Sequence, residues 1–219
     1  MAKDPLKERI RTRAALRRHL EALVGIDPRL APVLQAVGEV PMRRGNGGFA
    51  GLAGIVGAQQ LSVASANAIM GRLEALLGEM TAARFLKAKE ARVRGCGLSG
   101  GKYRTLTAIA EAEMSGEIDY QRLPRLPVED AIVSLTRLHG IGSWTAEIYL
   151  LFHLGHPDIF PAGDLALQKM VGVALGHEER PGEKLCREIA LTWSPHRGAA
   201  ALLLWRYFAV SKARERIAT

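Results

Sequence analysis

The sequence predicts an all-α fold in two lobes, on three observations. No stretch shows the period-2 alternation that is typical of a half-buried strand. Helical patterns alternate instead with short turns, in which Ser, Thr or Asp precedes a pattern and Gly follows it, as helix caps do. The segment 41–48 (PMRRGNGG) combines three glycines with an asparagine and a proline, and therefore marks a break between lobes.

The segment before this break is expected to be helical. Residues 1–24 are basic and have a helical pattern, which is typical of a solvated helix face; a phosphate-binding arm is the alternative. Asp27 is then a capping residue, and Pro28 is the first residue of a short helix that reaches about Val37.

Five further helices are expected between the break and the middle of the chain. Ser62 and Thr81 are N-cap candidates, and Gly78 is a C-cap candidate. Gln59 and Gln60 interrupt an apolar segment, which favours a satisfied helix-end contact over a functional role. The expected helices span 49–59, 63–77, 82–94, 102–114 and 128–138.

Residues 95–101 (GCGLSGG) form a glycine-dense loop between two of these helices. Leu98 is an apolar residue at the expected exposed tip of this loop. Because loops on a rigid scaffold often carry function, Leu98 is a candidate functional residue. The alternative is that Leu98 packs beneath the loop.

The stretch His139-Gly140-Ile141-Gly142 predicts a tight turn between two helices, the second of which begins at about Ser143. Glycine permits positive φ and lets another backbone come close. The N–H groups and the positive dipole end of the second helix suit an anion. The turn is therefore predicted to hold a phosphate, with Ile141 anchored in the core; a purely structural turn is the alternative.

Asp164 stands directly before an apolar helical pattern and is predicted to be its N-cap. Capping bonds favour the charged carboxylate and fix its orientation, so a catalytic role is compatible with capping. Trp144, near the start of the second hairpin helix, is either a core aromatic or a wall on which a base can stack. Two last helices are expected, one from Pro181 to about Leu191 and one from Ser194-Pro195 to about Ala213.

The composition limits the classes of protein and partner. There are 30 Lys and Arg residues against 22 Asp and Glu, a formal net charge of +8, which favours an anionic partner; solubility alone is the alternative. Cys96 and Cys186 are too few for a disulfide framework or a four-cysteine metal site, and both are expected to be buried. No apolar run reaches transmembrane length and the N-terminus lacks a secretory pattern, so we expect a cytoplasmic protein, nucleoid-associated if bacterial.

The motif residues together resemble a known superfamily. LTRLHGIGSWTA (135–146) followed by IFPAGDLAL (159–167) is similar to the helix-hairpin-helix DNA glycosylases, in particular the AlkA-like 3-methyladenine glycosylase II branch. The segments 54–69, 97–112 and 193–206 extend the resemblance over most of residues 49–206. The resemblance implies two helical lobes with an active-site cleft between them: 1–47 with 157–219, and 48–156, which contains the helix-hairpin-helix at about 128–154. Some members of the superfamily carry an extra N-terminal α+β domain, which is not expected here because the chain is too short for it.

The same resemblance implies an activity and a partner. The expected activity is that of a monofunctional glycosylase, which flips alkylated purines out of double-stranded DNA and hydrolyses the N-glycosidic bond in base excision repair. The protein is expected to act as a monomer and to leave an abasic site. Two alternatives remain at this point: a non-catalytic helix-hairpin-helix DNA-binding module, and a monofunctional glycosylase for a non-alkylated lesion.

Site roles follow from matching positions in the resemblance. Asp164 matches the catalytic aspartate. The lyase branches of the superfamily carry a nucleophilic lysine where this chain has Trp144, so no abasic-site lyase activity is expected. The iron–sulfur branches of the superfamily need four cysteines and this chain has two, so no cluster is expected, and no cofactor is expected to be required. The remaining implied roles are a substrate pocket at Trp144, Trp205 and Ile148; DNA binding at Gly140, Gly142 and Thr145, with a wedge at Leu98 or Ser99; and a structural Na⁺ or K⁺ on the main-chain oxygens of Thr136, Leu138 and Ile141.

Overall fold

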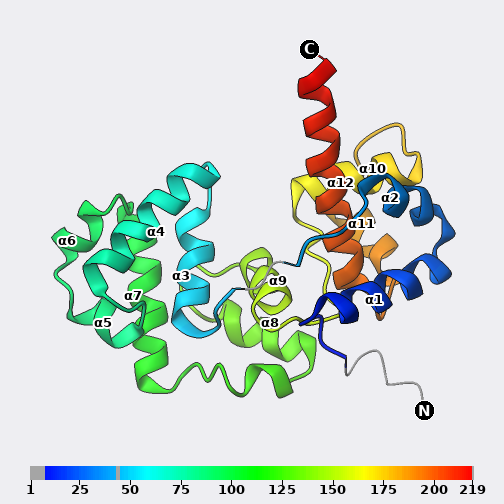
Figure 1. Cartoon of the computed structure of the whole chain (residues 1–219). Helices are drawn as coiled ribbons and strands as arrows, with labels where there is room; N and C mark the ends of the chain where they lie inside the picture. The colour runs from blue at the N-terminus through cyan, green and yellow to red at the C-terminus, as the bar shows by residue number, and fades with distance from the viewer. Residues whose placement is uncertain (1–7, 43–44, 219) are drawn as a thin grey trace. The chain divides into compact units, whose positions relative to one another are not determined.

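The computed structural model describes residues 8–42 and 45–218, and within these ranges it contains helices and no strand (Figure 1). The all-α prediction is therefore confirmed for the described part of the chain. None of the helices found there is both long enough and apolar enough to span a membrane.

The chain divides into two compact units. Unit 1 comprises Met1–Arg44 and Leu150–Thr219, and unit 2 comprises Gly45–Tyr149. The boundaries expected from the sequence were 47 and 156, so the second lies seven residues earlier than expected. The reason is that the helix α9 (Ser143–Phe152) runs unbroken through this boundary, and a continuous helix gives no compositional signal. The cleft between the lobes stays a prediction.

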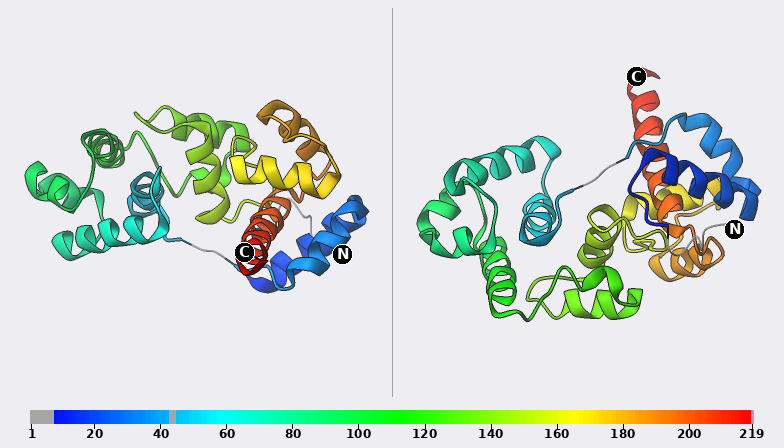
Figure 2. Two further views of the ribbon diagram at one scale, coloured as in Figure 1. Left: turned by 90° about the horizontal axis from the view of Figure 1, so that it is seen from above. Right: turned by 60° about the horizontal axis from the view of Figure 1, so that its bottom comes forward.

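Unit 1 is built around its last helix, α12. In Figures 1 and 2 the helices α1, α2 and α10 surround α12, and all three pack against it. The expected cap at Asp27 is confirmed: its side chain accepts a hydrogen bond from the backbone N–H of Arg29. The elements of this unit are α1 (Arg13–Ile26), the 3₁₀ turn η1 (Pro28–Leu30), α2 (Ala31–Val37), α10 (Leu165–Leu175), α11 (Glu183–Leu191) and α12 (Arg197–Ala218).

Both terminal helices differ from their expected bounds. The first was expected over 1–24, but α1 begins at Arg13, because Thr12 caps it by accepting a hydrogen bond from the N–H of Ala15. Residues 1–7 of that prediction lie outside the described residues. The last helix begins at Arg197 and continues to Ala218, five residues beyond its expected end.

Unit 2 packs several short helices against α7. Helices α3, α5 and α6 all contact α7, and α4 contacts α3 and α6 (Figure 1). Ser62, Thr81 and Gly78 cap their helices as predicted. The elements of this unit are α3 (Gly48–Ala58), α4 (Val63–Leu77), α5 (Ala82–Lys87), α6 (Glu90–Gly95), α7 (Gly100–Ser115), the 3₁₀ turn η2 (Leu123–Arg125), α8 (Val128–Thr136) and most of α9.

The prediction of a single helix over 82–94 is wrong, because this segment forms two helices, α5 and α6. Ala88 is extended (φ −77°, ψ 138°) and separates α5 from α6. Phe85 and Val93 are both buried. Positions eight residues apart lie on one apolar face of a straight helix, so the burial of both side chains does not itself require the break.

Candidate functional site

The predicted hairpin joins α8 to α9, and each of its glycines has a different structural role. Gly140 has φ +78°, and a Cβ at this position would lie 2.1 Å from Oγ1 of Thr105, so the turn packs directly on α7. Gly142 is exposed, and nothing lies within 4 Å of the position its Cβ would take. Ile141 is buried, as predicted. The hairpin is thus fixed on one side and open at Gly142.

Three helix ends of unit 2 are joined by hydrogen bonds. Oγ1 of Thr145, in the first turn of α9, accepts from Nε2 of Gln59 at 3.0 Å. The backbone oxygen atoms of Gly57 and Gln59, at the end of α3, each accept from Nζ of Lys102 at 2.8 Å. Burial lowers the pKa of Lys102. The start of α9, the end of α3 and the start of α7 therefore form one connected region, and the helix-end contact expected for Gln59 is confirmed.

The backbone conformation of the turn after α3 is a feature that the sequence did not predict. Gln60 is exposed and has φ 58°, a left-handed conformation that side chains other than glycine rarely adopt. The apolar side chains of Leu61 and Val63 beside it are 41% and 78% exposed. The sequence signals at this turn were the N-cap Ser62 and the polar dipeptide Gln59-Gln60, and neither predicts a left-handed residue.

The glycine-dense loop differs from its prediction at Leu98. This side chain is only 4% exposed, so the expectation of an exposed tip is wrong and the alternative, packing beneath the loop, is correct. Ser99 is exposed and caps α7 by accepting a hydrogen bond from the N–H of Lys102 at 3.3 Å. The wedge role of either residue stays a prediction.

Asp164 is the N-cap of α10, as predicted. One carboxylate oxygen, Oδ1, accepts hydrogen bonds from the backbone N–H groups of Ala166 and Leu167, each at 3.0 Å. The same oxygen accepts from the indole Nε1 of Trp205 at 3.3 Å. Three donors therefore converge on one oxygen and fix the plane of the carboxylate.

The surroundings of Asp164 hold this geometry in place. Nε2 of the buried Gln168 donates to the backbone oxygen of Ala162 at 2.8 Å and so fixes the loop that leads to Asp164. The ring of Trp205 stacks on Phe152, with centroids 5.4 Å apart. A small cavity of about 50 Å³ lies beside these two rings. Within unit 1, Trp205 therefore contacts both the half-buried carboxylate of Asp164 and this cavity.

The other predicted pocket residues lie on α9. Trp144 is half-buried in its first turn, and Ile148 is buried one turn further on. Their place in a common pocket with Asp164 stays a prediction.

The oxygens implied as cation ligands lie where α8 ends and the hairpin turns. The backbone oxygen of Leu138 accepts a hydrogen bond from the N–H of Ile141 at 3.1 Å. Carbonyl groups in the last turn of a helix lack intrahelical partners, and Na⁺ and K⁺ prefer neutral or charged oxygen ligands, so the donor type fits. No cluster of three or more His, Cys, Asp or Glu side chains that could hold a metal occurs among the described residues.

Unit 1 also contains a buried polar network that the sequence did not predict. Nδ1 of His19 and Nδ1 of His196 are 2.7 Å apart, although 177 positions separate the two residues. Asp158 accepts a hydrogen bond from Nε of Arg197 at 2.7 Å and another from Oγ of Ser194 at 2.8 Å. These contacts tie the start of α12 to α1 and to the segment before α10.

The fold of the described residues, with a glycine hairpin between two helices and a capping aspartate after it, is the one found in a class of DNA repair proteins. Residues 53–196 match the HhH-GPD superfamily of base excision DNA repair proteins, and the chain belongs to this superfamily. DNA-3-methyladenine glycosylase 1 of Schizosaccharomyces pombe is 34% identical over 158 residues, which are 69% of this chain and 68% of that protein.

Solved structures give the same result. A DNA-3-methyladenine glycosidase from Bacillus halodurans is 31% identical and superposes with a TM-score of 0.80, over 90% of this chain and 91% of that one. The 3-methyladenine DNA glycosylase of Schizosaccharomyces pombe in complex with abasic DNA is 30% identical, with a TM-score of 0.78 over 86% and 95% of the two chains.

Proposed function

We propose that the protein is a monofunctional DNA glycosylase of the 3-methyladenine type, which removes alkylated purines from duplex DNA in base excision repair. The observation that carries the proposal is the orientation of Asp164 by two backbone N–H groups and the indole of Trp205. The names of the relatives, which are 3-methyladenine glycosylases, support the substrate class. The solved complex of one relative with abasic DNA supports the partner and the product.

The hairpin supplies the grip on DNA in this proposal. Gly142 lets a phosphate approach the backbone, and backbone N–H groups in the first turn of α9 donate to it. A base inside a duplex is out of reach of any carboxylate, so the enzyme must flip it out at a cost of a few kcal/mol. Alkylated bases unstack more easily than normal ones, which supplies part of the selectivity.

Asp164 then acts on the sugar of the flipped nucleotide. A purine alkylated at N3 or N7 carries positive charge and leaves without a general acid. Its departure gives the sugar the character of an oxocarbenium ion. The carboxylate of Asp164 stabilises this cation and positions or deprotonates the attacking water, and the product is an abasic site in an intact strand.

Aromatic side chains recognise the charged base in the same scheme. Trp144 and Trp205 offer indole faces on which a cationic purine stacks, with an attraction of about 1–2 kcal/mol. Ile148 stands where related enzymes carry an aromatic residue, so the pocket is wider or differently selective at that position. Because Trp144 occupies the place of the lyase lysine, the chain forms no Schiff base with the sugar.

The proposal includes a monovalent cation that has a structural role and takes no part in the reaction. The backbone oxygens of Thr136, Leu138 and Ile141 would hold Na⁺ or K⁺ at the hairpin. The cation would add positive charge close to the bound phosphate. No cofactor and no iron–sulfur cluster is required.

The experiment compares wild type with Asp164→Asn on duplexes that carry one lesion each: 3-methyladenine, 7-methylguanine, uracil or hypoxanthine. Wild type should release the alkylated purines, and Asp164→Asn should lose at least a hundredfold in rate while its Kd for duplex DNA changes little. Borohydride should trap no covalent adduct. Equal excision by both proteins would refute the role of Asp164. Binding without release of any base would favour the non-catalytic module, and release of uracil or hypoxanthine alone would favour the non-alkylated class.

A further inference from the structure

One short segment of unit 2 has a high density of positive charge. Residues 84–104 contain seven basic side chains and a single acidic one, Glu90. The formal net charge of this segment is therefore +6. Its basic residues are Arg84, Lys87, Lys89, Arg92, Arg94, Lys102 and Arg104. Most of them are exposed, on α5, α6 and the first turn of α7, which lie side by side in Figure 1.

Two guanidinium groups converge at the end of this segment. A Cβ added to Gly100 would lie 3.6 Å from Nη1 of Arg104 and 3.7 Å from Nη2 of Arg94. Arg94 forms an ion pair with Glu90, in which Nη1 lies 3.3 Å from Oε1. Arg104 has no ion-pair or hydrogen-bond partner within the part of the chain that the structure describes. Two like charges over one glycine repel each other, and an anion placed there would relieve the repulsion.

The backbone beneath the two arginines is fixed. The buried side chain of Leu98 anchors the loop from below, and Ser99 caps α7. On the other side of the loop, Nε of Arg72 donates to the backbone oxygen of Cys96 at 2.9 Å. The guanidinium of Arg72 also lies close to Gly97, with Nη2 3.1 Å from the position of an added Cβ. Arg72 therefore holds the backbone of the loop in place from α4.

The helix that carries part of this basic surface, α7, also contacts the hairpin. Thr105, the residue after Arg104, is the one against which Gly140 packs. Lys102 and Gln59 link the start of α7 to Thr145 at the start of α9. Basic side chains that flank a backbone grip are the arrangement that follows a strand of nucleic acid over several phosphates.

We propose that Arg94 and Arg104, supported by Arg72, bind the phosphate backbone of duplex DNA at a place separate from the hairpin. This inference rests on the proposed function for its partner, double-stranded DNA. The surface adds affinity and salt dependence without reading sequence, because phosphate contacts carry no base information. Together with the hairpin it gives unit 2 two points of contact with the backbone, and so fixes the direction of the duplex on this unit.

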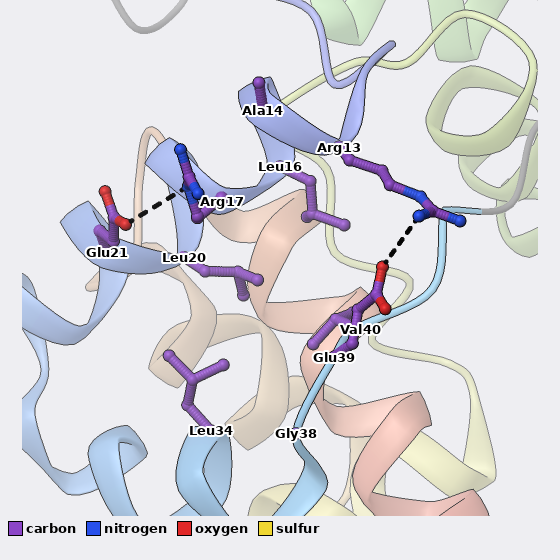
Figure 3. Close-up of a pocket in the computed structure, with 10 residues that line it drawn as sticks. All are labelled: Arg13, Ala14, Leu16, Arg17, Leu20, Glu21, Leu34, Gly38, Glu39 and Val40. Atoms are coloured by element: carbon purple, nitrogen blue, oxygen red, sulfur yellow. Dashed lines mark ion pairs between the residues drawn. The ribbon is translucent and has the colours of Figure 1, made fainter.

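The experiment measures binding of an undamaged duplex by fluorescence anisotropy between 50 and 200 mM KCl. The variants are Arg104→Gln, which has no internal partner to lose, and the double variant Arg94→Gln/Arg104→Gln. The control is Arg13→Gln/Arg17→Gln, with the same change in charge. These two arginines lie at the rim of a groove of about 480 Å³ in unit 1 and already pair with Glu39 and Glu21, at 3.4 and 3.7 Å (Figure 3).

The double variant should weaken binding about tenfold or more at 100 mM KCl, and should reduce the slope of log K against log[KCl] by about 1 to 2. Arg104→Gln should show a smaller loss of affinity than the double variant. The Kd of the control should stay within about twofold of wild type. Variants that match the control in Kd and slope would overturn the inference, even if wild type excises alkylated bases. If wild type binds the duplex through these arginines but releases no base, the proposed activity fails and this surface stands. If wild type binds no duplex, both fail.

Discussion

Trp205 has two separable properties at the carboxylate. Its ring stacks on Phe152, and its indole N–H donates to Oδ1 of Asp164. The resemblance assigned Trp205 to a pocket for the base, whereas the geometry adds a role in orienting the carboxylate. Because a phenylalanine keeps the ring and loses the donor, one substitution separates these roles.

Trp205→Phe should slow excision about tenfold with little change in the Kd for lesion-bearing DNA. A hydrogen bond to a charged acceptor contributes about 1.5–3 kcal/mol, and at 3.3 Å we expect the lower end of this range. Single-turnover kinetics and anisotropy measure the two quantities separately. Trp205→Ala also removes the ring and should weaken lesion binding as well. A Phe variant as fast as wild type would show that the indole N–H does not orient Asp164.

At the scale of the element, the hairpin glycines predict opposite phenotypes. Gly140→Ala should destabilise the fold by about 2–4 kcal/mol, the sum of a left-handed backbone and a Cβ forced against Thr105. Gly142→Ala has free space for its Cβ and should change the free energy of unfolding by less than about 0.5 kcal/mol. It should still weaken duplex binding, because the added methyl group meets the phosphate that is proposed to approach there.

Urea unfolding followed by circular dichroism, together with anisotropy on a duplex, checks both glycines. Adding Thr105→Ala to Gly140→Ala should recover the steric part of the loss and leave the backbone part. If Gly142→Ala binds DNA as tightly as wild type, then the phosphate does not approach this glycine.

Helices of this chain could be predicted where the signal is local. The capping side chains each accept a hydrogen bond from an N–H group two or three residues further along the chain, so local sequence is enough to predict them. These caps are Asp27, Ser62, Thr81 and Asp164. The break at Ala88 has no such signal, because it depends on where the core of unit 2 lies. The hairpin and the carboxylate of Asp164 could be predicted for the same reason, because each lies within a short, contiguous stretch of the family motif.

The pairings between distant residues could not be predicted in this way. Asp27 caps η1 as expected, but it also accepts a hydrogen bond from Nε1 of the fully buried Trp193 at 2.8 Å, 166 positions away. Burial of Leu98 and pairing of His19 with His196 likewise depend on how helices pack. Basic residues at 84–104 were visible in the sequence, but only the fold brings the guanidinium groups of Arg94 and Arg104 over one glycine.

At the scale of the whole molecule, unit 1 draws its stability from both ends of the chain, and its buried polar groups make that stability depend on pH. Burial, together with the nearby Arg9 and Arg197, lowers the pKa of His156 to about 4, although Asp158 opposes the shift. Burial and the neighbouring His19 also lower the pKa of His196. Burial alone would raise the pKa of Asp158, but hydrogen bonds from Arg197 and Ser194 outweigh it and lower that pKa.

The sign of the pH dependence follows from these directions. An unfolded histidine binds a proton near pH 6.5, whereas folded His156 does not bind one until about pH 4. Its contribution is therefore fully present above pH 6.5 and is lost as the pH falls from 6.5 towards 4. The carboxylate of Asp158, whose pKa is lowered, contributes above its ordinary pKa near 4 and loses its contribution only at lower pH. The histidines thus control the first part of acid unfolding.

His156→Asn tests this because the amide oxygen can replace Nδ1 as the acceptor for the N–H of Asp158, a bond of 3.1 Å, but cannot titrate. Between pH 7 and pH 5, wild type should lose more unfolding free energy than the variant, by on the order of 1–2 kcal/mol. Urea unfolding at both pH values measures the difference. The exposed His177 provides the control, since His177→Asn should lose as much as wild type. Equal losses in wild type and His156→Asn would mean that another group governs the acid limit of unit 1.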